Sequence, residues 1–200
     1  MDEDTIFKII SVLVFIGIIG GMVTAAYILR KGPPAKNPNA ITYNNFPFIR
    51  DQNNFWLTQW QNKDKIYNLQ FRYLPNETLD IPVEGQIDNS FFTGEVYITF
   101  DPAPSGLQNL TLAAGELSLN LARGLNYSLK PSCTKNASGC ENLPIITCEQ
   151  NKSVPIIYLS YKTPTMISLN GNCITIQGGG RELIRSVDRL LYLWYGIITA

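Results

Sequence analysis

EVYITFDPAPSGLQNLTLAAGELSLNLARG, the stretch from Glu95 to Gly124, places a β-strand directly before a helix. Its first six residues are rich in β-branched and aromatic side chains, and Asp101-Pro102 ends them with a strand-breaking pair. Apolar residues then recur at a 3-4-3-4 spacing, which predicts an amphipathic helix. This apolar stripe consists of Leu107, Leu110, Ala114, Leu117 and Leu121.

The same helix carries signals at its ends and in its middle. We expect Ser105 as the N-cap residue and Gly124 as the residue just beyond the last turn. Gly115 lies inside the helix, where glycine is about 1 kcal/mol less favourable than alanine. We therefore expect close packing to require a glycine at this position.

Three aromatic-rich segments precede this stretch and are expected to be strands. They cover residues 46–49, 55–60 and 65–73, and polar breaks between them suit hairpin turns. In the third segment, apolar side chains alternate with mostly polar ones, which predicts one buried face. That face consists of Tyr67, Leu69, Phe71 and Tyr73.

Four short strands and a second helix are expected after the first helix. The strands cover residues 144–148, 155–161, 165–169 and 173–177, and Asn170-Gly171-Asn172 joins the last two as a tight hairpin. The second helix begins near Gly180. Its expected buried face consists of Leu183, Ile184, Val187, Leu190, Leu191 and Trp194. Its expected exposed side chains are Arg181, Arg185, Ser186, Asp188 and Arg189.

The order of strands, helix, strands, helix predicts the fold class. We expect an α+β domain over residues 41–200, in two layers, with both main helices packed on one mostly antiparallel sheet.

Residues 9–29 are expected to form a transmembrane anchor. They contain no charged side chain, and 21 helical residues at about 1.5 Å each span the roughly 30 Å of bilayer hydrocarbon. Residues 1–8 would be a short cytoplasmic tail and residues 30–40 a Pro-rich linker. A cleaved signal peptide is the alternative, but the acidic start and the apolar run beyond residues 23–25 favour an uncleaved anchor.

Gly17, Gly21 and Ala25 repeat every four residues and therefore share one face of the expected membrane helix. Small residues at this spacing allow close approach of a second helix. This face is a candidate contact for another membrane protein or for a second copy of this chain.

The four cysteines indicate which side of the membrane the domain faces. Cys133, Cys140, Cys148 and Cys173 suit two disulfides, which persist outside the cytosol, whereas their spacing does not suit a zinc site. A Cys133–Cys140 and a Cys148–Cys173 bridge fit the expected strands, but the other two pairings stay open. Five Asn-x-Ser/Thr sequons, at Asn76, Asn109, Asn126, Asn136 and Asn151, also favour an extracytoplasmic domain. The basic residues Arg30, Lys31 and Lys36 after the anchor argue for the opposite orientation.

Composition removes several classes of function. The chain has 16 basic and 16 acidic side chains and no histidine. A nucleic-acid partner is disfavoured because it requires a basic surface. The commonest general base and metal ligand is missing, and we predict no catalytic residue, no metal and no cofactor.

Three local patterns are candidate sites, and we expect each of them to be structural. The glycine-rich turn at residues 177–182 precedes a helix but lacks a phosphate-binding pattern. Trp56, Trp60 and Tyr73 could stack on sugar rings, although half-buried sheet aromatics are far commoner. Five carboxylates within 22 residues match no ligand loop. They are Asp80, Glu84, Asp88, Glu95 and Asp101.

Six segments of the domain form a recognisable set, at residues 81–85, 96–102, 112–117, 144–148, 172–178 and 182–189. Together they resemble a family of uncharacterised, N-terminally anchored proteins from small-genome archaea. The resemblance implies an archaeal envelope setting and an outer domain with paired cysteines, and it carries no activity or functional residue.

We therefore expect a single-pass envelope protein whose outer domain binds or assembles with other proteins. The alternatives are a membrane-anchored hydrolase or glycan-processing enzyme that uses two of the five carboxylates, and an accessory subunit of a secretion or pilus machine. The expected partners are the lipid bilayer, other envelope proteins, or a second copy of the chain.

Overall fold

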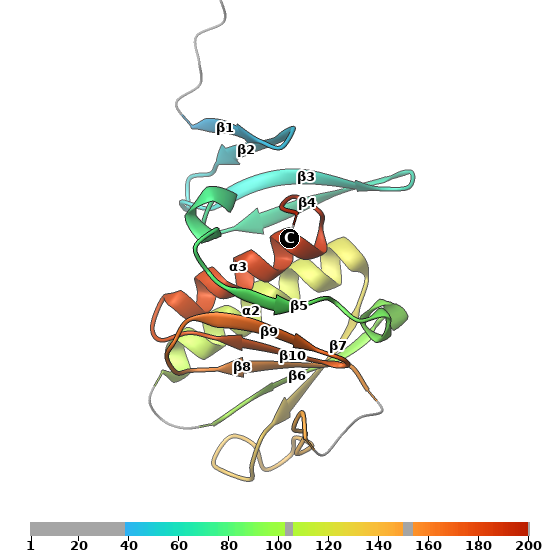
Figure 1. Cartoon of the computed structure of the whole chain (residues 1–200), viewed down its shortest axis with the longest axis vertical. Helices are drawn as coiled ribbons and strands as arrows, with labels where there is room; N and C mark the ends of the chain where they lie inside the picture. The colour runs from blue at the N-terminus through green and yellow to red at the C-terminus, as the bar shows by residue number, and fades with distance from the viewer. Residues whose placement is uncertain (1–38, 103–105, 150–153, 200) are drawn as a thin grey trace, which may run out of the picture. The chain divides into compact units, whose positions relative to one another are not determined.

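The computed structural model describes residues 39–102, 106–149 and 154–199, which belong to one compact unit, Asn39–Ala200 (Figure 1). The expected tail, anchor and most of the linker lie outside the described residues, as do Gly17, Gly21 and Ala25. Among the described residues, no helix is long and apolar enough to cross a bilayer. The elements are β1 (Ala40–Tyr43), β2 (Phe46–Arg50), β3 (Trp56–Asn62), β4 (Lys65–Phe71), η1 (Pro75–Thr78), β5 (Val83–Gly85), η2 (Asn89–Thr93), β6 (Glu95–Phe100), α2 (Leu107–Leu125), β7 (Ser128–Cys133), β8 (Ile156–Ser160), β9 (Met166–Asn170), β10 (Cys173–Gln177) and α3 (Glu182–Trp194).

The first sheet, sheet A, confirms the antiparallel part of the predicted α+β fold. Its strands follow the order β1-β2-β3-β4, and every pair is antiparallel. The predicted alternation in β4 is present, because Leu69 and Phe71 are fully buried whereas Ile66 is exposed. Asn44, Asn45 and Lys63 adopt positive φ angles in the hairpin turns, a conformation that asparagine tolerates better than most residues.

The second sheet, sheet B, differs from the predicted antiparallel arrangement. Its order is β5-β9-β10-β8-β6-β7, and of these pairs only β9–β10 is antiparallel. The parallel pairing of β6 with β7 arises because α2 is the crossover between them and returns the chain in the same direction. Strand β7 was not expected from the sequence. It contains Pro131, which is tolerated because β7 is an edge strand of sheet B.

The described domain has three layers, whereas the sequence predicted two. Helices α2 and α3 pack against each other and lie between the sheets: α2 contacts β4 of sheet A, and both helices contact strands of sheet B (Figure 1). The prediction of an exposed face on α3 was therefore partly wrong, because Ser186, Asp188 and Arg189 are buried.

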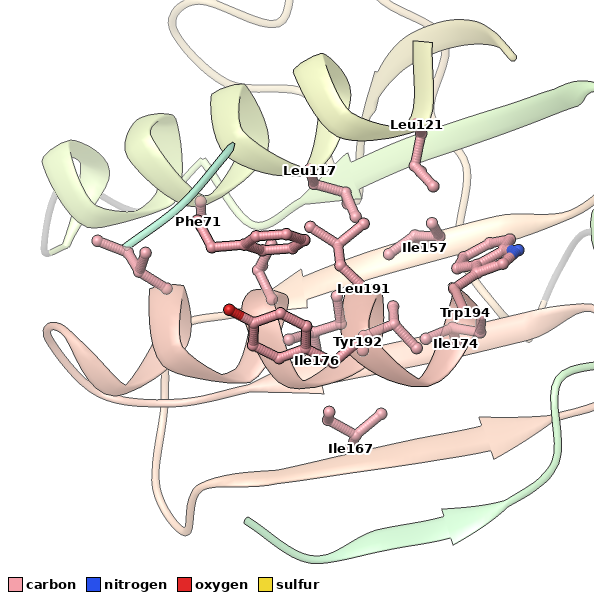
Figure 2. Close-up of a cluster of buried hydrophobic side chains, with 14 of the residues drawn as sticks. Phe71, Leu117, Leu121, Ile157, Ile167, Ile174, Ile176, Leu191, Tyr192 and Trp194 are labelled. Carbon is pink, nitrogen blue, oxygen red and sulfur yellow. The ribbon is translucent and has the colours of Figure 1, made fainter. Parts of the chain in front are cut away.

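The core fills the space on both sides of the two helices (Figure 2). Leu117 and Leu121 of α2 meet α3, which carries the predicted apolar residues, and the isoleucines of β8, β9 and β10 complete the cluster. Fully burying one such side chain stabilises the fold by about 1.5–3 kcal/mol. The ring of Phe71 packs on that of Tyr192 with centroids 4.3 Å apart, joining sheet A to α3.

Two local predictions were wrong. Gly124 lies inside α2, and Asn126 is the residue that takes the left-handed conformation, with φ of 58°, at the helix end. Residues 144–148 do not form a strand; Ile145 makes only an isolated bridge with Cys133. The predicted N-cap, Ser105, lies outside the described residues.

The two favoured disulfides are present, Cys133–Cys140 and Cys148–Cys173. The first closes a short loop after β7, and the second ties the segment before β8 to the start of β10. Both are typical of a domain that folds in an oxidising compartment.

Candidate functional site

The free edge of β4 is covered by side chains from the two helices. Asn120 of α2 bonds to both backbone groups of Gln70: its Oδ1 accepts from the amide nitrogen at 3.3 Å and its Nδ2 donates to the carbonyl oxygen at 2.9 Å. At Gln70 this amide takes the place of a neighbouring strand and satisfies backbone groups that the edge of sheet A would otherwise expose.

Asp188 of α3 continues this capping beyond the strand. Its Oδ2 accepts hydrogen bonds from the amide nitrogens of Arg72, at 3.0 Å, and Tyr73, at 2.9 Å. The hydroxyl of Tyr192 donates to the carbonyl oxygen of Tyr73. The chain is therefore held firmly where it leaves β4.

Asp188 forms a carboxyl pair with Glu116 of α2, and both side chains are buried. Burial raises the pKa of both groups, and the negative charge of Glu116 raises that of Asp188 further. Oε1 of Glu116 and Oδ1 of Asp188 have no hydrogen bond to another described residue. Because two adjacent buried carboxylates cannot both ionise at low cost, this arrangement favours a form in which the pair shares one proton.

The carboxyl pair orients Arg72. The Nε of Arg72 donates to Oε2 of Glu116 at 2.7 Å, and its guanidinium carbon lies 4.6 Å from the centroid of the Phe55 ring. The side chain of Arg72 is 37% exposed. Within the described structure its two terminal nitrogens have no hydrogen-bond partner, so they are available to an oxyanion, which a guanidinium group can bind through two hydrogen bonds.

Arg72 lies between two adjoining cavities, which we call the polar pocket and the helix groove. The polar pocket has a volume of about 640 Å³ and contains no carboxylate among its lining residues. It is lined by Asn53, Asn54, Arg72, Tyr73, Gln108, Asn109, Leu112, Arg181 and Ile184. The helix groove has a volume of about 200 Å³. It is lined by Phe55, Asn68, Gln70, Arg72, Thr111, Leu112, Gly115, Glu116, Leu119, Asn120 and Arg123.

Local structure at the ends of three elements builds the polar pocket. The carboxylate of Asp51 accepts from the amide nitrogens of Asn53 and Phe55, which fixes the turn that presents Asn53 and Asn54. The first turn of α2 supplies two further amides. Arg181, exposed at the start of α3, adds a second guanidinium without a hydrogen-bond partner in the described residues. The pocket is thus positively charged and rich in hydrogen-bonding groups.

The five carboxylates singled out in the sequence do not share a cavity. Asp80 pairs with Arg185, and this hydrogen bond lowers the pKa of Asp80. Asp88 caps η2, and the hydrogen bond from the backbone of Ser90 lowers its pKa. Glu95 and Asp101 lie near opposite ends of β6, and Glu84 is exposed on β5. None of the five lines any of the described pockets.

The three aromatic residues considered for sugar binding, Trp56, Trp60 and Tyr73, do not line a common cavity in the described structure. Trp56 is buried, and Trp60 is half-buried and donates its ring N–H to the carbonyl oxygen of Tyr195 at 3.0 Å. Only Tyr73 lines the polar pocket. A sugar-stacking platform made of these three rings is therefore not present.

The glycine-rich turn before α3 has a structural role. A Cβ atom on Gly178 would lie 2.5 Å from the amide nitrogen of Leu183, so no larger residue fits there. The amide nitrogen of Glu182 already donates to the carbonyl oxygen of Gly179, and Ile184 donates to Arg181. These contacts occupy donors that an anion would need.

Sequence reasoning missed Arg72, Glu116 and Asp188. A signal for Asp188 exists, because it lies four residues after Ile184 and three before Leu191, within the apolar stripe of α3. An acidic residue within an apolar stripe is either reached by solvent or buried with a hydrogen-bonding or charged partner. Identifying Glu116 as that partner requires knowing that α2 and α3 are neighbours.

Comparison of the chain with protein-family models, with curated proteins and with solved structures gave no match.

Proposed function

We propose that this protein is a membrane-anchored extracytoplasmic binding domain of the cell envelope, which associates with another envelope protein and is not an enzyme. The observation that carries the proposal is Arg72, which lines the polar pocket and is held by Glu116 of the buried carboxyl pair and by the ring of Phe55. Prior orientation of a side chain reduces the entropy lost when a partner binds.

The use of the buried carboxyls favours binding over catalysis. Asp188 has one oxygen committed to two backbone amides, and Glu116 has one committed to Arg72. Their remaining oxygens are buried away from the surface, where a substrate does not reach them. Both groups therefore support the position of Arg72, which is the role expected of residues behind a binding surface.

The two disulfides support the extracytoplasmic side of the proposal. Among the described residues no cysteine is free. Disulfides of this kind are rare in proteins of a reducing cytosol.

Affinity capture of the tagged full chain from gently solubilised membranes tests the proposal. We expect one envelope protein to be recovered reproducibly, and we expect maleimide to label the unreduced chain at none of its four cysteines. Recovery of the chain alone in every preparation would argue against a binding role, and labelling of all four thiols would argue against an oxidising location.

A further inference from the structure

Gly115 is a feature of α2 that packing among the described residues does not explain. The sequence led us to expect a close contact, but a Cβ atom added there would meet no atom within 4 Å. A glycine inside a helix is nevertheless unfavourable by about 1 kcal/mol relative to alanine. Gly115 does affect the surface, because it lines the helix groove and a larger side chain at this position would occupy the groove.

The helix groove has exposed apolar side chains, and it adjoins the polar pocket, which is basic. Leu112 and Leu119 lie one turn either side of Gly115 and are 38% and 46% exposed. Arg72 borders both cavities, and Arg123 lies at the far end of the groove. The only acid in either lining is Glu116, which is already paired with Arg72.

We propose that the polar pocket and the helix groove together bind an acidic, partly apolar peptide segment of the partner protein. An Asp or Glu side chain of the partner lies in the polar pocket between Arg72 and Arg181. A neighbouring Leu, Ile or Phe side chain lies over Gly115 between Leu112 and Leu119. This inference rests on the proposed function and adds the chemistry of the partner to it.

Charge complementarity and the amides of the pocket support this occupant. A carboxylate can bind both terminal nitrogens of Arg72. Asn53, Asn54 and Gln108 carry donors and acceptors that match the backbone of an extended peptide. A purely apolar helix would leave Arg181 and the terminal nitrogens of Arg72 without an acceptor. A polyanion without apolar groups would leave the leucines uncovered.

Fluorescence polarisation of labelled octapeptides with the full chain in detergent tests the inference. The probes are acetylated and amidated, carry one Glu beside one Leu in a Ser-Gly background, and are compared with a set in which Gln replaces Glu. We expect the Glu peptides to bind at least about tenfold more tightly. Equal binding of the two sets, or no binding of either, would overturn the proposal.

Two variants distinguish binding at this site from nonspecific binding of the peptides. We expect Arg181→Gln and Gly115→Leu each to weaken binding of the Glu peptides about tenfold. Gly115→Leu should also leave the thermal midpoint unchanged or higher, because leucine favours a helix and its Cβ atom meets no described atom outside the helix backbone within 4 Å. Arg50→Gln is the matched control, since Arg50 also stacks on a ring, 5.4 Å from the Trp56 centroid, but lines neither cavity.

The same variants distinguish failure of this inference from failure of the proposed function. If wild type captures a partner from membranes and both variants capture it equally well, the site is wrong and the binding function stands. If wild type captures no partner, the proposed function is wrong, whichever peptides bind.

Discussion

Asp188 is the residue whose chemistry departs most from that of an exposed carboxylate. Its pKa and that of Glu116 are raised, so both bind a proton more tightly in the folded than in the unfolded chain. The resulting stabilisation is complete below the ordinary pKa values of 3.8 and 4.5, and it is lost as the pH rises through the raised values. Arg72, Tyr73 and Tyr192 are other titratable residues that interact with the pair.

Asp188→Asn should remove most of this pH dependence. The amide oxygen can accept from Arg72 and Tyr73 as the carboxylate does, and the amide nitrogen can donate to Oε1 of Glu116. We expect the free energy of unfolding of the variant to increase relative to wild type as the pH rises from 4 to 8. Urea denaturation at several pH values measures this difference, and parallel curves for the two proteins would contradict the shared proton.

Asp188→Leu distinguishes the proton from the capping role. Leucine leaves the amide nitrogens of Arg72 and Tyr73 without an acceptor, and it removes the partner of Glu116. We expect a loss of about 3 kcal/mol at every pH between 4 and 8. A loss below 1 kcal/mol in the same urea experiments would show that water satisfies these groups.

At the scale of elements, Asn120 links α2 to β4, and its replacement tests this link. In Asn120→Leu, both backbone groups of Gln70 lose their partner, so we expect a loss of about 1–3 kcal/mol and faster hydrogen exchange at the Gln70 amide. Gln59→Leu is the control, because Gln59 makes only an exposed contact with Asn68 and should change stability by less than about 0.5 kcal/mol. Unchanged exchange at Gln70 would contradict the capping of β4 by α2.

The elements also show what local sequence patterns can and cannot predict. The alternation in β4, the Asn-Gly hairpin and the stripe of α2 are local signals, and each produced the expected element. The number of layers is not a local property, yet the number of layers around a helix decides whether its polar side chains are exposed. Ser186 and Asp188 are polar and were expected to be exposed, but both are buried. Ser186 donates to the carbonyl oxygen of Gln177 in β10, and Asp188 lies against Glu116 of α2 and the end of β4. β7 was missed because Ser128–Cys133 contains a lysine and a proline and has no clear period.

The candidate site was harder to predict than the fold for the same reason. Arg72, Glu116 and Asp188 come from a loop and two helices that are separated by 44 and 116 residues in the chain. Each is an ordinary charged residue in its own segment. Only the packing of α2 and α3 against the end of β4 gives the three a common role.

At the scale of the whole molecule, the two disulfides should differ in their effect on stability. Cys148–Cys173 closes a sequence separation of 25 residues and Cys133–Cys140 one of 7. On the chain-entropy model, the longer loop contributes about 3.5 kcal/mol and the shorter about 2.5 kcal/mol. The longer bridge also holds the segment before β8 against sheet B, where Ile146, Ile156 and Cys173 form a small separate cluster. We therefore expect the Cys148→Ser/Cys173→Ser double variant to be at least about 1 kcal/mol less stable than Cys133→Ser/Cys140→Ser in urea denaturation of the full chain. Equal losses would mean that the segment joined by the longer bridge stays in place without it, and that the cluster around Ile146 is sufficient to hold it.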